Sequence, residues 1–175
     1  MEDLRFPIGR YRGPSDFNGE AIQSYIRTIK EYPGHITALV EHMSENQLDT
    51  RYRPEGWTVR QVVHHTVDSH LNAYLRFKRI ITEENPTILP YDQAAWAALP
   101  DSTGGNIQAP LRMISALHER WVNFMNSLTD DDFDRGYTHP EHSGTQKLFF
   151  LLGLYAWHCN HHFGHIEQLS LREGW

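Results

Sequence analysis

The sequence contains a single cysteine, Cys159, and no hydrophobic run long enough to span a membrane. A lone cysteine excludes an internal disulfide framework. The most apolar stretch, residues 148–157, is ten residues long, whereas a membrane-spanning helix needs about 20. Positive charge is also scarce: 16 Lys and Arg face 22 Asp and Glu, and the net charge of −6 works against binding the phosphates of nucleic acid. We therefore expect neither a membrane nor a nucleic acid as a partner.

The start of the sequence lacks the cationic stretch of a secretory signal peptide, because Glu2 and Asp3 follow the first methionine. We therefore expect a cytoplasmic, reducing location. A hydrophobic content of 39% in 175 residues is enough for one sizeable core, and no internal repeat or low-complexity segment divides the chain. The prediction is a single domain over residues 1–175.

Apolar residues recur at helical spacing in four segments. The predicted helices cover residues 20–45, 59–82, 111–128 and 146–172. The second has the clearest start, because Thr58-Val59-Arg60-Gln61 matches a capping box with Thr58 as the N-cap. Pro33 and Gly34 lie inside the first, so we expect that helix to be kinked or broken into two pieces. Four helices without a convincing strand predict an all-α four-helix bundle.

Two segments outside these helices are expected to be irregular. Residues 1–18 mix prolines and glycines with the aromatics Phe6, Tyr11 and Phe17, which predicts an arm that packs on the body of the bundle. Residues 84–108 contain three prolines and two glycines and predict a long crossover loop between the second and third helices, with a short helical turn near its middle. Because long loops often line sites, the crossover is a candidate wall of a functional site.

Histidine is the residue type in excess, with 12 in the chain. In the last predicted helix, His158 and His162 are about 40° apart around the axis and about 6 Å apart along it, so both rings can reach one ion. His161 and His165 have the same spacing, which leaves two ligand registers open. A helical pair needs a third ligand from another element. The second helix offers three candidates for it: His64, His65 and His70.

The helical wheel does not choose among these three candidates. His70 falls in the apolar stripe, whereas His65 shares a flank with the small side chains of Ser69 and Ala73, which could leave space for an ion. Cys159 points about 100° away from His158, which argues against a thiolate-rich structural zinc site. Three neutral imidazoles suit zinc, nickel, copper or iron and leave a position for water or substrate. Such a site could activate water or ionise a thiol.

Motifs around these histidines resemble those of a known family, the DinB-like superfamily, and most closely its YfiT branch of metal-dependent hydrolases. The two main motifs are Gly56-Trp57-Thr58-Val59-Arg60-Gln61-Val62-Val63-His64-His65 and His158-x-x-x-His162. Further shared motifs, spread over nearly the whole chain, include Phe6-Pro7-Ile8-Gly9, Pro90-Tyr91-Asp92 and His118-x-Arg120-Trp121.

The resemblance implies a metal-ligand set. In that family the histidine eight residues after the tryptophan binds the metal, and here that residue is His65; the other two ligands fall on His158 and His162. The resemblance also implies a four-helix bundle, a cytoplasmic location, a homodimer and one divalent ion per chain, for which we expect zinc or nickel. No residue is assigned as a general acid or base.

Three functions stay open at this point. The first is a hydrolase that activates water at the three-histidine site and acts on a small molecule. The second is a metal-dependent thiol S-transferase of the bacillithiol or glutathione type, which resembles some members of the superfamily. A basic pocket for the acidic arms of the thiol would favour it, with Arg60, Arg76 and Arg120 as candidates. The third is a non-catalytic, stress-related bundle, in which a protein side chain would take the fourth coordination position.

Overall fold

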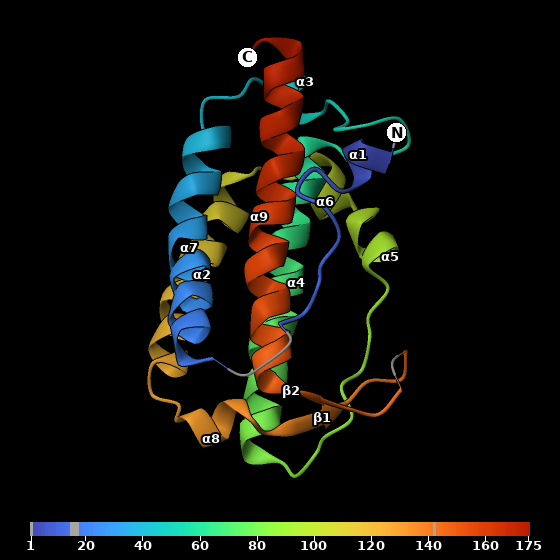
Figure 1. The fold of residues 1–175 in the computed structure, drawn as a ribbon. Coiled ribbons are helices and arrows are strands. Elements are labelled where there is room, and N and C mark those ends of the chain that lie inside the picture. The colour runs from blue at the N-terminus through green and yellow to red at the C-terminus, as the bar shows by residue number, and fades with distance from the viewer. Residues whose placement is uncertain (1, 15–17, 142) are drawn as a thin grey trace.

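The computed structural model describes residues 2–14, 18–141 and 143–175. Four long helices run side by side along it (Figure 1). They are α2 (Gly19–Val40), α4 (Val59–Thr82), α7 (Gln108–Met125) and α9 (Leu148–Glu173). The order around the bundle is α2, α7, α4, α9, because α2 and α4 each contact both α7 and α9. The predicted all-α four-helix bundle is confirmed, and α9 lies between α2 and α4.

Helix α4 begins where the capping box predicts. The Thr58 side chain accepts a hydrogen bond from the Gln61 backbone N–H at 3.1 Å, and the Gln61 side-chain oxygen accepts one from the Thr58 N–H at 3.0 Å. Two of the N–H groups left without helical partners at the start of α4 are thereby satisfied. Because the cap fixes where α4 begins, it also fixes the direction in which His64 and His65 leave the helix.

Helix α2 is continuous over Gly19–Val40, so of the two outcomes expected at Pro33, a kink or a break, the break does not occur. Proline has no N–H, and the carbonyl of Ile29 therefore loses its usual helical donor. The ring of His118, on α7, lies with Nδ1 at 2.5 Å from that carbonyl oxygen. A tertiary contact thus satisfies the acceptor that the proline leaves free. The helix ends at Val40, before the predicted end, and a separate capped turn, α3 (Glu45–Leu48), follows.

The structure also contains two short strands that the sequence pattern does not indicate. Strands β1 (Gly136–Thr138) and β2 (Thr145–Lys147) pair antiparallel before α9. The crossover carries two short helices where one turn is predicted, α5 (Gln93–Ala97) and α6 (Pro100–Gly104), both packed on α4. A one-turn helix, α8 (Asp130–Phe133), precedes the hairpin. The crossover and the hairpin are tied together by a bridge between Thr87 and Thr138.

The described part of the N-terminal arm packs along α9 (Figure 1), starting with the short α1 (Glu2–Arg5). The Tyr11 hydroxyl donates to the Phe150 carbonyl at 2.9 Å. Gly13 lies so close to Phe150 that a Cβ there would sit 2.2 Å from its ring. These contacts confirm that the arm packs on the bundle; the predicted arm residue Phe17 lies outside the described residues.

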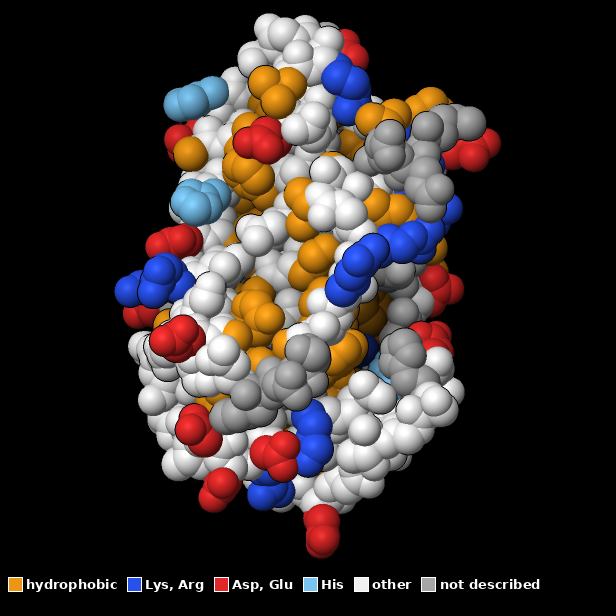
Figure 2. Space-filling view, in the orientation of Figure 1, with side chains coloured by type: hydrophobic (Ala, Val, Ile, Leu, Met, Phe, Trp, Pro, Cys, Tyr) orange, Lys and Arg blue, Asp and Glu red, His pale blue; other side chains and the backbone are white. Residues whose placement is uncertain are grey.

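The core lies between the four long helices and includes Cys159, which is fully buried. In the space-filling view (Figure 2), hydrophobic side chains show between the helices along the middle of the face, and acidic side chains are scattered around its edge. Within the described part of the chain, no helix combines the length and the apolar character that crossing a membrane requires.

Candidate metal centre

Three histidines from two neighbouring helices converge inside the bundle. Helix α4 supplies His65, and α9 supplies His158 and His162; their ligand atoms all lie within 4.8 Å of one another. His65 and His162 are buried, and His158 is partly exposed. Among the residues that the structure describes, this is the group of His, Cys, Asp or Glu side chains that could hold a metal ion. We refer to these three side chains as the histidine triad.

The geometry of the histidine triad suits a metal ion. The Nε2 atoms of His158 and His162 lie 3.1 Å apart, close to the about 3.3 Å expected for two nitrogens on one tetrahedral ion with bonds near 2.0 Å. The His65 ring lies 4.8 Å from that of His162 and 5.4 Å from that of His158, between centroids. Trp57 covers the His65 ring at 4.5 Å.

Burial keeps the histidine triad in the form that binds metals. Loss of solvation first, and the neighbouring His165 second, lower the pKa of His65 to about 3. Burial first, and the other histidines second, hold the pKa values of His158 and His162 well below the ordinary value. Neutral imidazole has a free lone pair at neutral pH, so no proton has to be displaced when an ion binds.

The remaining candidate ligands on α4 lie outside the histidine triad. His64 faces the crossover, where a Cβ on Gly105 would lie 3.1 Å from its ring. His70 is fully buried on the other side of His158, with its Nε2 at 2.9 Å from His158 Nδ1. The Nδ1 atom of His70 in turn lies 2.7 Å from Nε2 of His118. Sequence reasoning noted His118 only as part of a motif and gave it no role.

The alternative ligand pair in α9, His161 and His165, lies toward the N-terminal arm. His161 stacks on Trp157 at 4.3 Å, and His165 stacks on Tyr52 at 4.0 Å, between ring centroids. The Nε2 atom of His165 lies 3.1 Å from the Arg5 carbonyl oxygen. These two histidines therefore form a layer between the histidine triad and the N-terminal arm.

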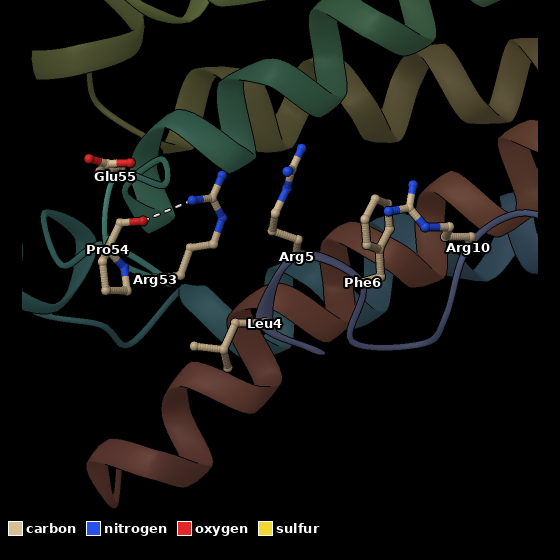
Figure 3. Close-up of a pocket in the computed structure, with 7 residues that line it drawn as sticks. All are labelled: Leu4, Arg5, Phe6, Arg10, Arg53, Pro54 and Glu55. Atoms are coloured by element: carbon tan, nitrogen blue, oxygen red, sulfur yellow. Dashed lines mark hydrogen bonds between the residues drawn. The ribbon is translucent and has the colours of Figure 1, made fainter. Parts of the chain in front are cut away.

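A pocket of about 670 Å³ is lined by the N-terminal arm, whose Arg5 carbonyl contacts this layer through His165. Figure 3 shows the side chains that line it. It is formed by the arm and by the turn before α4. Its lining residues are Leu4, Arg5, Phe6, Arg10, Arg53, Pro54 and Glu55. Arg5 and Arg53 point to the same side of the pocket, and the Arg10 guanidinium lies 4.1 Å over the Phe6 ring. The pocket is therefore basic, and Phe6 connects it to His161 at 5.9 Å.

The arginines that the sequence offered for a basic pocket are engaged elsewhere. Arg60 is buried between the carboxylates of Glu45 and Asp49, at 2.5 and 2.8 Å. The other two also lie away from the pocket. Arg76 donates to the Tyr155 hydroxyl, and Arg120 stacks over the Tyr74 ring. The cations of the pocket come instead from irregular segments, where no helical pattern indicates which side chains meet.

Comparison with known proteins shows the family of this chain. The sequence model of the DinB superfamily matches residues 29–166. Relatives from Bacillus cereus and Bacillus thuringiensis, each called "Putative metal-dependent hydrolase", are 47% identical over the full length of both chains. A solved structure covers 99% of each chain with 45% identity and a TM-score of 0.96; it is YfiT from Bacillus subtilis, described as "a probable metal-dependent hydrolase with an unusual four-helix bundle topology". The chain belongs to the DinB superfamily.

Proposed function

We propose that this protein is a metal-dependent hydrolase whose ion is held by His65, His158 and His162. The observation that carries the proposal is the convergence of these three buried or half-buried imidazoles without a fourth His, Cys, Asp or Glu from the described residues. Three protein ligands leave a position for water or substrate, which is the arrangement of catalytic rather than structural zinc sites. The names of the relatives support the same activity.

A divalent ion bound there supplies a Lewis acid that polarises an acyl or phosphoryl oxygen and lowers the pKa of water toward about 7. The chain contributes neutral ligands, and Trp57 shields the His65 ring on one side. We propose zinc or nickel, because imidazole nitrogen is a ligand that both metals accept. A structural metal, the third reading of the sequence, is disfavoured because no fourth protein ligand is found among the described residues.

Metal analysis and a hydrolysis screen test the proposal. The purified protein is analysed for bound metal, then assayed with chromogenic ester, amide and phosphoester substrates before and after chelation. Activity should disappear on chelation and return with Zn²⁺ or Ni²⁺. His65→Ala should abolish both metal binding and hydrolysis, whereas the matched control His42→Ala, at an exposed position, should retain both. Metal bound at the wild-type ratio by His65→Ala would refute the ligand set.

A second candidate function, metal-dependent thiol S-transfer, is favoured by the basic pocket. Within the described parts of the chain, neither Arg5 nor Arg53 forms an ion pair with a carboxylate. Guanidinium groups bind carboxylates in bidentate fashion, so the pocket suits the acidic arms of a low-molecular-weight thiol. One layer of histidines separates it from the histidine triad, where the thiol sulfur would be ionised.

Glutathione serves as the probe for this second function. In the metal-loaded protein, its sulfur would displace chloride from 1-chloro-2,4-dinitrobenzene: a C–S bond forms, chloride leaves with the bonding electrons, and the thiol proton is released. Arg53→Gln should weaken glutathione binding measured by calorimetry about tenfold or more, while the exposed Arg112→Gln should not. Conjugation at the uncatalysed rate, with no glutathione binding, would exclude this activity and leave the hydrolase proposal standing.

A further inference from the structure

A line of hydrogen bonds crosses the bundle and ends at the candidate metal centre. It starts at the Ile29 carbonyl on α2, passes through His118 on α7 and His70 on α4, and reaches His158 on α9. The three contacts measure 2.5, 2.7 and 2.9 Å. His70 and His118 are both at most 1% exposed. All four long helices therefore contribute one group each to a single buried line.

The direction of this line follows from its first acceptor. A carbonyl oxygen only accepts, so Nδ1 of His118 carries the hydrogen. A neutral imidazole has one N–H, which leaves Nε2 of His118 as an acceptor for the Nδ1–H of His70. By the same step, Nε2 of His70 accepts from the Nδ1–H of His158. The Nε2 atom of His158, which faces His162 at 3.1 Å, is then left with its lone pair.

The rings along the line are held neutral by their surroundings. Burial lowers the pKa of His118 to about 4, and the His70 side chain is fully buried. Neither ring has a carboxylate among the hydrogen-bond partners found in the described parts of the chain. The aromatic side chains around them, Tyr32 and Trp121, are likewise uncharged. One hydrogen per ring is thus the state that the packing favours.

Pro33 gives the line its fixed starting point. In an uninterrupted helix, the N–H of residue 33 would donate to the Ile29 carbonyl. Because proline has no N–H, the Ile29 carbonyl accepts a hydrogen bond from His118 instead. A buried carbonyl without a donor would be costly, so the contact from His118 is favoured strongly over its alternatives.

We propose that His70 and His118 are positioning residues of the metal centre, which fix His158 with its hydrogen on Nδ1 and thereby present its Nε2 lone pair to the ion. The inference rests on the proposed metal site for its purpose, but the hydrogen positions can be tested without any metal. Outer partners of this kind orient the ligand ring and make its lone pair more basic. Here the partner is a neutral histidine rather than the carboxylate or carbonyl that usually fills this role.

Nuclear magnetic resonance of the metal-free protein tests the hydrogen positions directly. Correlations between ring nitrogens and carbon-bound ring protons in ¹⁵N-histidine-labelled protein distinguish a nitrogen that carries hydrogen from one that does not. We expect hydrogen on Nδ1 in His70, His118 and His158. Hydrogen on Nε2 of His158 would overturn the proposal. This measurement requires neither metal binding nor activity, so its failure is distinct from failure of the proposed function.

A matched pair of amide variants tests the effect on metal binding. His118→Gln can keep an acceptor near the Nε2 position, facing His70. His118→Asn can keep a donor toward the Ile29 carbonyl but cannot reach His70. We therefore expect His118→Asn to weaken Zn²⁺ binding by about 10- to 100-fold, measured by competition with a chelating dye, and His118→Gln to weaken it much less.

Both variants place an amide in the same buried position, so a general loss of packing would affect them alike. Near-ultraviolet circular dichroism checks that each is folded. Equal Zn²⁺ affinity in the two variants, whether reduced or unchanged, would overturn the positioning role. The hydrogen positions in the wild-type protein keep the proposal testable if either variant fails to fold.

Discussion

His118 supplies the hydrogen bond that Pro33 removes from its own helix. The Nδ1 atom of His118 lies 2.5 Å from the carbonyl oxygen of Ile29, the residue four positions before the proline. Proline is rare inside helices, and this contact connects the helical turn that contains Pro33 to the interior of the bundle. It makes the local stability of α2 depend on a side chain of α7.

A double-mutant cycle measures this dependence. In the Pro33→Ala protein, the backbone N–H of residue 33 can donate to the Ile29 carbonyl, so removal of His118 should no longer leave that carbonyl unsatisfied. His118→Ala should therefore reduce the free energy of unfolding by about 1 kcal/mol less in the Pro33→Ala background than in the wild type. Urea denaturation of the four proteins gives the coupling, and strictly additive effects would contradict it.

The Thr58 cap should have a measurable energy. Thr58→Ala removes the acceptor for the Gln61 N–H and should lower the free energy of unfolding by about 1 kcal/mol. Thr28→Ala is the matched control, because Thr28 lies half-buried inside α2, where its hydroxyl donates to the Ser24 carbonyl and caps no helix end. If the two variants have the same melting temperature, the cap contributes no net stability.

Metal retention should separate the two registers of α9. His158→Ala and His162→Ala each remove a proposed ligand and should weaken metal binding by several orders of magnitude. His161→Ala and His165→Ala leave the histidine triad intact and should cost at most about 10- to 100-fold. Metal content after dialysis of the four variants decides between the registers. Loss of the ion only from the last two would assign the site to His161 and His165.

Stability should fall as the pH drops below about 6.5. The pKa of His118 is about 4 in the folded protein, against about 6.5 in an unfolded chain. Between these values the unfolded chain binds a proton that the folded protein does not, so unfolding becomes more favourable toward acid. Each such histidine contributes up to about 1.4 kcal/mol per pH unit. Urea denaturation of metal-free protein from pH 4 to 8 should show this slope.

The His118→Gln variant provides the control for that slope. This variant has no titrating side chain at position 118. The slope of the unfolding free energy against pH should therefore be smaller by up to about 1.4 kcal/mol per pH unit, which corresponds to one proton fewer taken up on unfolding. The exposed His42→Ala variant serves as a second comparison. An unchanged slope in His118→Gln would mean that His118 is not the neutral group described above.

Local patterns predicted the parts of the fold that local interactions determine. The start of α4 followed from a capping box of four residues, and both ends of that helix agree with the structure. The strands β1 and β2 were missed because three residues are too few to show the alternation typical of a strand. The contact that satisfies the Ile29 carbonyl inside α2 could not be predicted from a local pattern, because His118 lies 89 positions from Ile29.

The candidate site likewise has a part that local spacing predicts and a part that it does not. Spacing indicated that His158 and His162 could act together, but the choice of His65 depended on the family resemblance. The role of His70 could not be read from its place in the apolar stripe, since a buried histidine and a core residue have the same periodicity. The identity of the ion and the expected homodimer stay predictions; sedimentation at micromolar concentration tests the latter.

The basic pocket joins a segment near the start of the chain to a helix near its end. Arg5, on the arm, contacts His165 across 160 positions of sequence. A compound that fills the pocket would bind only when the arm is seated, so its binding energy would also hold the arm in place. Such a ligand should slow hydrogen–deuterium exchange in residues 4–10. The arm would then act as a removable side wall, and its rate of detachment would limit how quickly a bound product could leave.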